Sequence, residues 1–259
     1  MNHLQKELDT GRSIARRAGE IALRYFRTGL AFEAKSDDSP VTRADRECEQ
    51  FIARELAQSF PGDGLMGEEG ASKESVNGRR WIIDPIDGTR DFVRGGPTWS
   101  ILIGLEQDGE VVAGFAGMPA LGDLYSASRG GGAFVNDEQI HASSIADSIQ
   151  AVVCLDSFNN VRAHPFAGSL LDWLQPFWAV RSMGGCLDAL MVARGQAEIW
   201  IETNGKPWDF APLKIIAEEA GARFFDFAGK PTIYGGNCVI CNPAFEAMMR
   251  SFVTTPRGL

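Results

Sequence analysis

The sequence WIIDPIDGTRDF, residues 81–92, joins an apolar run to a turn and then to a helix start. The run WII predicts a buried strand, and Asp84 stands at its end. Pro85 restricts Asp84 to an extended conformation, so the direction of its carboxylate is fixed. Gly88 permits a backbone angle that other residues rarely adopt, and Thr89 can begin a helix. We therefore expect a strand, a tight turn and a helix in this order.

The two carboxylates of this segment are candidate metal ligands. Asp84 and Asp87 lie on either side of Ile86, so both side chains and the Ile86 carbonyl can converge on one point. Oxygen ligands of this kind suit Mg²⁺ or Mn²⁺ rather than zinc, which favours sulfur and imidazole. The Gly88 and Thr89 amides at the helix start would hold a phosphate beside the metal, because they lack helical partners. The alternative is that Asp84 only ends a strand and Asp87 only caps a helix.

Further acidic residues at constrained places favour the metal interpretation. Glu68 lies within GEEG (67–70), and Asp209 follows Pro207-Trp208 at a predicted helix start. Each has a structural alternative. Asp209 alone can be a helix cap, and Thr42-x-x-Asp45 is a capping-box pattern, so Asp45 can serve only to stabilise its helix.

The rest of the chain predicts layered sheets and helices. Apolar residues at three- and four-residue spacing predict helices over 4–26 and from Thr42 to the Pro61-Gly62 stop, and 62–77 is rich in turn residues. Short apolar runs then predict strands in WIID (81–84), WSILIGL (99–105), VVAGFAGM (111–118) and DLYSAS (123–128). From about residue 150, the expected order is a strand in AVVCLD (151–156), a loop, a strand in FWAVRS (177–182), a helix through CLDALMVARG (186–195), a strand in AEIWIE (197–202), a helix in DFAPLKIIAEEAG (209–221), strands in ARFFDF (222–227) and NCVICN (237–242), and a closing helix.

This order predicts one compact unit over 1–259. About 1–148 reads as helices packed on strands, an α+β subdomain, and 149–259 alternates strand and helix, an α/β subdomain. No linker or internal repeat separates the two parts.

Composition and charge exclude several classes of protein. The 259 residues are 44% hydrophobic and 23% charged, as in ordinary globular proteins. A formal net charge of −9 argues against nucleic acid as the main partner. No apolar run is long enough to span a membrane, and the first twenty residues lack the apolar core of a secretory signal. We therefore expect a cytoplasmic protein with reduced cysteines and no membrane partner.

Motifs of other enzyme classes are missing from the sequence. It has only three histidines, no G-x-S-x-G, no H-E-x-x-H and no P-loop, which argues against a Ser-His hydrolase, a zincin or a P-loop enzyme. Gly130–Gly132 is expected to form a tight turn. Cys238 and Cys241 have CxxC spacing, but apolar neighbours favour a buried strand over a zinc or redox site.

The residues quoted so far carry a resemblance to a known family. Lys35 with V-T-x-A-D (41–45), G-E-E (67–69), W-I-I-D-P-I-D-G-T (81–89) and P-W-D (207–209) resemble, in order and spacing, the motifs of the inositol monophosphatase superfamily. The resemblance covers essentially the whole chain. It implies a layered αβαβα sandwich and a magnesium-dependent, lithium-sensitive phosphomonoesterase with two or three metal ions per site, which Mn²⁺ can replace.

The resemblance also implies a role for each matching residue. Glu68, Asp84 and the Ile86 carbonyl would bind one metal, and Asp84, Asp87 and Asp209 a second. Asp45 and Glu68 would hold the waters around a third, weaker ion, and Thr89, hydrogen-bonded to Asp45, would orient the attacking water. The implied substrate-binding residues are Asp87, Gly88, Thr89, Glu202 and Asp209, with Glu202 on the alcohol portion of the substrate. Glu202 has the alternative of a surface residue at a strand end.

A charge argument supports metal dependence. Five carboxylates around a phosphate dianion carry about −7, and three divalent ions would reduce this to about −1. We expect in-line attack by a metal-activated water on phosphorus, without a covalent intermediate, and stabilisation of the leaving oxygen by the second metal.

The sequence narrows the substrate only in part. DGTRDFVRGGPTW (87–99) resembles the histidinol-phosphatase branch more than the inositol branch, which usually has Asn at Asp91 and often His at Arg94. Because histidinol phosphate is cationic, Asp91, Asp188 and Glu202 are candidate contacts, with the alternative for each that it is a plain surface or cap residue. Inositol 1-phosphate and related sugar or nucleotide esters are the alternatives, and a non-catalytic regulatory binding protein is a minor one.

The resemblance implies a homodimer as well. Trp173, Phe177 and Trp178 form an aromatic group that could be an interface, although we expect it to belong to the core.

Overall fold

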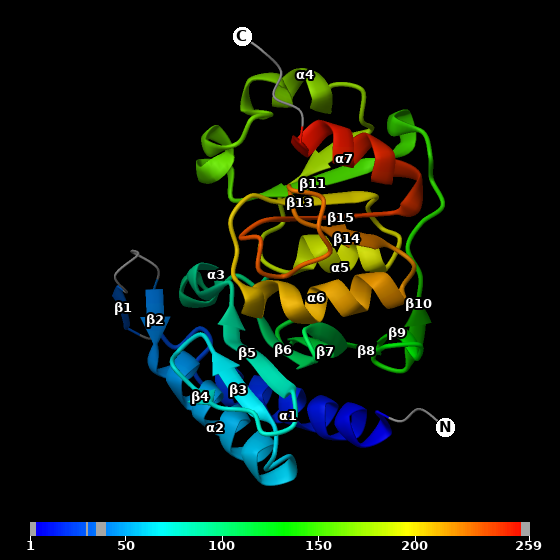
Figure 1. Cartoon of the computed structure of the whole chain (residues 1–259). Helices are drawn as coiled ribbons and strands as arrows, with labels where there is room; N and C mark the ends of the chain where they lie inside the picture. The colour runs from blue at the N-terminus through cyan, green and yellow to red at the C-terminus, as the bar shows by residue number, and fades with distance from the viewer. Residues whose placement is uncertain (1–3, 30, 35–39, 255–259) are drawn as a thin grey trace.

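The computed structural model describes residues 4–29, 31–34 and 40–254 (Figure 1). Lys35, part of the quoted motif, lies outside the described residues. The helices are α1 (Gln5–Leu23), α2 (Arg43–Ser59), α3 (Thr89–Arg94), α4 (Leu170–Leu174), α5 (Leu187–Ala193), α6 (Pro207–Glu219) and α7 (Glu246–Thr254). The strands are β1 (Phe32–Ala34), β2 (Pro40–Thr42), β3 (Gly64–Gly67), β4 (Ser72–Lys73), β5 (Arg79–Asp87), β6 (Ser100–Gln107), β7 (Glu110–Met118), β8 (Asp123–Ser128), β9 (Gly132–Val135), β10 (Glu138–Ile140), β11 (Val152–Asp156), β12 (Ala179–Arg181), β13 (Ile199–Glu202), β14 (Arg223–Phe225) and β15 (Cys238–Cys241).

Helices and sheets alternate in layers, as the resemblance implied. The first sheet has the strand order β10-β9-β8-β7-β6-β5-β3-β4, the second has the order β12-β11-β13-β15-β14, and β1 and β2 form a separate two-stranded sheet. Helices α1 and α2 cover the outer face of the first sheet, α5 and α6 lie between the sheets, and α4 and α7 lie beyond the second sheet (Figure 1).

Three groups of buried apolar side chains correspond to these layers. The first fills the space between α1, α2 and the larger sheet, and includes Trp81 and Phe115. The second surrounds α6 between the sheets, and the third lies between the smaller sheet and α7. Because burial of a large apolar side chain contributes about 2 kcal/mol, the apolar faces of the helices hold the layers together.

Several element boundaries differ from those expected. Helix α1 ends at Leu23, three residues before Phe26, and turns follow it. The turn-rich stretch 62–77 contains β3 and β4, whose four and two residues are too short for a recognisable alternation. The second sheet is mixed, because β15 runs antiparallel to both β13 and β14. Helix α4 lies in a stretch expected to be a loop.

Other expectations hold. A turn at Gly130 and Gly131 joins β8 to β9, and Cys238 and Cys241 are free, buried residues of β15. Of the three aromatic residues expected in the core, Phe177 is buried and Trp173 stacks on Phe252. Trp178 is instead 73% exposed. Assignment of Trp178 to the core was therefore wrong.

Successive parts of the chain form the two large sheets. The chain passes from the first sheet to the second between Ile140 and Val152. The division into subdomains near residue 148 stays a prediction, because α6 packs on strands of both sheets.

Of the helices in the described part of the chain, none has the length and apolar character needed to cross a membrane.

Candidate active site

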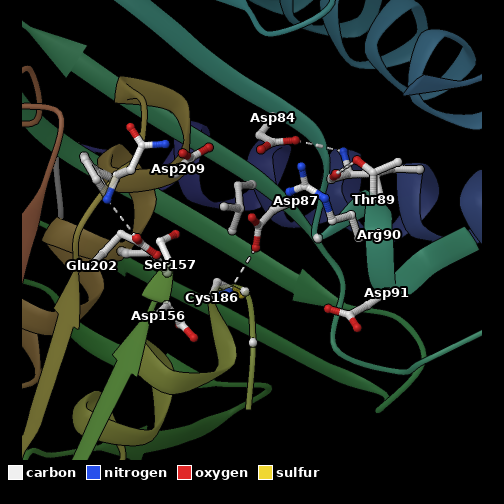
Figure 2. A pocket seen from close by; sticks show the side chains of 18 of the residues that line it. Asp84, Asp87, Thr89, Arg90, Asp91, Asp156, Ser157, Cys186, Glu202 and Asp209 are labelled. Atoms are coloured by element: carbon white, nitrogen blue, oxygen red, sulfur yellow. Dashed lines mark hydrogen bonds between the residues drawn. The ribbon is translucent and has the colours of Figure 1, made fainter. Parts of the chain in front are cut away.

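A cavity of about 380 Å³ opens where the two sheets and α6 meet (Figure 2). Its walls contain a single arginine, Arg90, and seven acidic residues: Glu68, Asp84, Asp87, Asp91, Asp156, Glu202 and Asp209. Ionising so many acidic groups in one cavity costs free energy unless cations bind there. The cavity is therefore the candidate active site.

Asp84, Asp87 and Asp209 come together at one point of this cavity. Each offers one carboxylate oxygen, and these oxygens lie within 4.8 Å of one another. Asp84 and Asp87 come from the end of β5, where the pairing with β6 shifts register between them, and Asp209 comes from the first turn of α6. The irregularity in β5 allows both of its carboxylates to face the cavity (Figure 2).

Backbone and side-chain donors orient these three carboxylates. Asp84 Oδ1 accepts a hydrogen bond from the Ile86 amide at 3.0 Å. Asp87 Oδ2 accepts one from the Cys186 amide at 3.0 Å and one from the Ser100 hydroxyl at 3.2 Å. Asp209 Oδ2 accepts one from the Lys206 amide at 2.7 Å, which is part of a capping box. Asp209 is thus a cap and a cavity residue at once.

Burial and mutual repulsion favour the protonated forms of these groups. Burial, followed by the charges of Glu68, Asp87 and Asp209, raises the pKa of Asp84 well above its ordinary value. Burial raises the pKa of Asp87 to about 6. Burial and the charge of Asp87 raise the pKa of Asp209 to about 7. A bound cation would reverse these shifts, because it stabilises the ionised forms.

Glu68 reaches the same cavity from the loop after β3. Its amide donates to the Ile83 carbonyl at 3.1 Å, which ties the loop to β5. Glu49 of α2 holds the other side of the loop by accepting from the amides of Glu69 and Ala71, both at 2.8 Å. Glu69 is not among the residues that line the cavity. Glu49 escaped sequence analysis because nothing in the helical pattern of α2 distinguishes it from a surface residue.

Asp45 is completely buried and does not line the cavity, but it contacts Thr89, which does. Its Oδ2 accepts from the Thr42 amide at 2.8 Å and the Thr42 hydroxyl at 2.5 Å, and Thr42 caps α2 in return. The Thr89 hydroxyl lies 3.3 Å from Asp45 Oδ1 and 3.0 Å from the Ile86 carbonyl oxygen, so it can donate to either. Burial raises the pKa of Asp45 to about 6. The capping box and the contact with Thr89 therefore coexist.

Gly88 makes the turn that brings Thr89 to the cavity. Its φ of +78° is the left-handed conformation, and a Cβ there would lie 2.8 Å from the Thr98 carbonyl oxygen. Helix α3 begins directly after it. Gly88 and Thr89 both line the cavity, beside Asp84 and Asp87.

The second sheet contributes a wall that sequence analysis found only in part. Asp156 and Glu202 end the neighbouring parallel strands β11 and β13 and are direct register partners. Glu202 accepts from the Asn204 amide at 3.0 Å, and burial raises its pKa to about 8. Asp156 accepts from Trp200 Nε1 at 2.9 Å and from the Ser182 hydroxyl at 3.0 Å, and burial and the charge of Asp188 raise its pKa to about 7. Asp156 was missed, although an apolar strand ending in an acid was also the signal that revealed Asp84.

The two remaining candidate acids have different surroundings. Asp91 of α3 lines the cavity. Asp188 does not line it, because its Oδ2 is turned back to the amides of Met183 and Gly184 at 2.8 and 3.1 Å. Asp188 is therefore neither the substrate contact nor the surface or cap residue that the sequence left open, since the first turn of α5 directs this side chain into the protein.

The donor set of the cavity fits a hard divalent cation. Within the described ranges 4–29, 31–34 and 40–254, the one cluster of potential metal ligands is Asp84, Asp87 and Asp209, all oxygen donors. Oxygen donors close together and partly buried are what Mg²⁺ and Mn²⁺ require. No histidine lines the cavity, which disfavours zinc.

Known proteins resemble this chain over nearly its whole length. A sequence model of the inositol monophosphatase family matches residues 3–255. A histidinol-phosphatase from Chlorobaculum parvum is 40% identical over 255 residues, which are 95% of each chain. An inositol-1-monophosphatase from Mesorhizobium japonicum is 32% identical over 258 residues, 98% of this chain and 95% of that one. The solved structure of an IMPase from Thermotoga maritima superimposes with a TM-score of 0.86 at 31% identity, over 95% of this chain and 96% of that one.

Proposed function

The chain belongs to the inositol monophosphatase family and is a phosphoric monoester hydrolase, and from this premise we propose that its substrate is histidinol phosphate. The observation that carries the proposal is the acidic wall of the second sheet. Asp156 and Glu202 face the cavity there, and neither takes part in an ion pair with the described residues. An ester whose alcohol portion is cationic would supply the missing positive charge.

We propose that metal ions bind on the opposite side of the cavity, where Asp84, Asp87 and Asp209 come together and Glu68 also lines the wall. Glu68, Asp84 and the Ile86 carbonyl would hold one Mg²⁺, Asp84, Asp87 and Asp209 a second, and Asp45 with Glu68 the waters of a third. Bound there, the cations would make water more acidic and stabilise negative charge on the leaving oxygen.

The chain's own groups would orient the two reactants. The Gly88 and Thr89 amides would donate to the phosphate oxygens, where α3 begins. The Thr89 hydroxyl lies between Asp45 and the Ile86 carbonyl, so its proton is engaged and its lone pairs can accept from the attacking water. The water is then directed at phosphorus, opposite the leaving alcohol.

The acids of the second sheet would bind the alcohol portion of the ester. Glu202 and Asp156 end adjacent strands and both line the cavity, so Glu202 would contact the cationic group and Asp156 would add charge beside it. A raised pKa does not prevent this, because an arriving cation favours ionisation of the carboxyl group.

Inositol 1-phosphate is the second candidate substrate. Glu202 can accept from a hydroxyl as readily as from an ammonium group, and the inositol-1-monophosphatase from Mesorhizobium japonicum supports this alternative. A neutral alcohol would bring no positive charge to favour ionisation of Asp156 and Glu202, which is why we rank it second.

A side-by-side assay tests the substrate. We expect kcat/KM for histidinol phosphate to exceed that for inositol 1-phosphate by at least about tenfold at the same Mg²⁺ concentration. A preference of that size for inositol 1-phosphate would reverse the ranking. By family resemblance we further propose inhibition by lithium, a homodimer and a cytoplasmic location, which stay predictions.

A further inference from the structure

The loop Ser182–Cys186 joins the second sheet to the carboxylates of the first. It runs from β12 to α5, and its residues Gly184, Gly185 and Cys186 line the cavity. The Cys186 amide donates to Asp87 Oδ2 at 3.0 Å, as drawn in Figure 2. The orientation of Asp87 therefore depends on where this loop lies.

Two consecutive residues of the loop, Gly185 and Cys186, pack closely against Asp87 and its hydrogen-bond donors. Gly185 has a φ of +56°, and a Cβ at that position would lie 3.0 Å from Asp87 Oδ2 and 3.1 Å from the Thr98 carbonyl oxygen. The Cys186 thiol lies 3.0 Å from the Ser100 hydroxyl, which itself donates to Asp87 Oδ2. One donor to Asp87 Oδ2 is therefore the Cys186 amide, and the other, the Ser100 hydroxyl, is in contact with the Cys186 thiol. A small shift of the loop would disturb both hydrogen bonds.

Two buried acids hold the loop from the side of the second sheet. Asp156 Oδ1 accepts from the Ser182 hydroxyl at 3.0 Å. Asp188 Oδ2 accepts from the amides of Met183 and Gly184 at 2.8 and 3.1 Å. The loop is therefore fixed at its first three residues by these acids and at its last residue by Asp87.

Asp188 does not act as an ordinary helix cap. Helix α5 begins at Leu187 with Cys186 as its N-cap, and no side-chain hydrogen bond caps it. Both amides bound by Asp188 precede the helix. The residue is fully buried, and its Oδ1 has no hydrogen-bond partner in the described part of the chain. A buried carboxylate is costly to desolvate, and the neighbouring side chains of Asp156 and Cys154 bring no positive charge, so the two loop amides are the donors that compensate for its burial.

From these contacts we infer that Asp188 is a positioning residue for the metal site, which acts by holding the loop Ser182–Cys186 so that the Cys186 amide orients Asp87. With Oδ2 engaged by two donors, Oδ1 of Asp87 is the oxygen left for a cation. This inference rests on the proposed metal-dependent function and extends it to a residue outside the cavity.

Binding of Mn²⁺ alone, measured by titration calorimetry without substrate, tests the role of Asp188. Asp188→Leu removes the acceptor and keeps a branched side chain, and we expect about tenfold weaker Mn²⁺ binding, the size typical of losing a group that orients a metal ligand. Asp188→Asn retains an oxygen for the two amides and should bind within about threefold of the wild type. Val192→Ala, also fully buried on α5, is the matched control, expected to lower the melting temperature while leaving the affinity within about twofold.

A second pair of variants tests the contact with Asp87 directly. Cys186→Pro removes the donor N–H of the backbone together with the thiol, and the Cys186 φ of −69° suits proline at a helix start. Cys186→Ala removes the thiol and keeps the N–H. We expect about tenfold weaker Mn²⁺ binding for the proline variant and a change within about threefold for the alanine variant. If Asp188→Leu does not fold, this pair decides.

The outcomes separate the inference from the proposed function. Folded Asp188→Leu or Cys186→Pro protein that binds Mn²⁺ as the wild type does would overturn the inference alone. Wild-type protein that binds no divalent cation would instead overturn the metal-dependent function, and the inference with it.

Discussion

The two walls of the cavity are both acidic, but they differ in how the charge is arranged. On the wall of the first sheet, the oxygens of Asp84 and Asp87 lie within 4.8 Å of each other and of Asp209. On the wall of the second sheet, Asp156 and Glu202 stand on neighbouring strands, and each accepts hydrogen bonds from neutral donors. Convergent carboxylates suit a small cation of high charge, and separated ones suit a larger cation of low charge. One cavity can therefore hold the metal and the alcohol portion of an ester at opposite sides.

Metal removal should produce the largest effect and act through the first wall. We expect dialysis against EDTA to reduce phosphate release below detection and Mg²⁺ to restore it, because the repulsion among the carboxylates excludes a phosphate dianion without cations. The measurement is phosphate release from histidinol phosphate before and after restoration. Full activity in protein shown by elemental analysis to be metal-free would refute metal dependence.

Asp87→Asn should have the next largest effect. The amide keeps the size of the side chain but removes one negative charge from the convergent group, and we expect turnover to fall by at least about 10²-fold with the fold intact. Circular dichroism checks the fold, and Mn²⁺ titration should show weaker binding.

Asp91→Asn is the matched control for Asp87→Asn. Asp91 lines the same cavity from α3 but stands outside the convergent group. Its substitution should leave Mn²⁺ affinity within about threefold of the wild type. Equal loss of affinity in both variants would mean that the convergent group of Asp84, Asp87 and Asp209 is not the metal site.

The difference between the walls also explains what the sequence could predict. Asp84 and Asp87 were found because Pro85 restricts the backbone at Asp84 and Gly88 permits a tight turn after Asp87, all within the five residues 84–88. Asp156 ends a similar apolar strand, but no proline or glycine follows it directly. The pairing of β11 with β13 depends on tertiary structure and cannot be predicted from a local sequence pattern. The proximity of Asp209 came from the family resemblance, because spacing alone does not reveal which helix start meets which strand end.

The errors have related physical causes. Asp188 remained a candidate for the cavity, because an acid near a helix start has the same pattern whether it points outward or turns back to the preceding loop. Strand β3 was missed because it is short and contains two glycines, yet it pairs with β5 and positions Glu68. Layer order and the main helices were predictable, since amphipathic periodicity extends over many residues.

Glu202→Gln should produce a smaller effect that depends on the substrate. The amide keeps a hydrogen-bond acceptor and loses the charge, so we expect kcat/KM for histidinol phosphate to fall about tenfold and that for inositol 1-phosphate to change less than about threefold. Mn²⁺ affinity should stay close to that of the wild type, which separates this wall from the other. An equal fall for both esters would show that Glu202 does not recognise positive charge.

The smallest effect is a pH dependence of stability that distinguishes the walls. Burial raises the folded-state pKa of Asp87, Asp209, Asp156 and Glu202 to between about 6 and about 8 in the absence of metal. Because the native state then binds more protons than the unfolded chain, metal-free protein should lose stability as pH rises from about 4, with the loss complete above about 8. We expect its melting temperature to fall by several degrees between pH 5 and pH 8.5.

Saturating Mg²⁺ should reduce the fall in melting temperature with rising pH but not abolish it. A cation holds Asp84, Asp87 and Asp209 ionised at every pH in the range, so their contribution disappears, whereas Asp156 and Glu202 remain without a cation until substrate binds. Glu202→Gln in Mg²⁺ should flatten the remaining slope above pH 7, because the amide does not titrate. Differential scanning calorimetry at five or six pH values, with and without Mg²⁺, measures both parts. An unchanged slope in Mg²⁺ would place the titrating groups away from the convergent carboxylates and contradict the division between the walls.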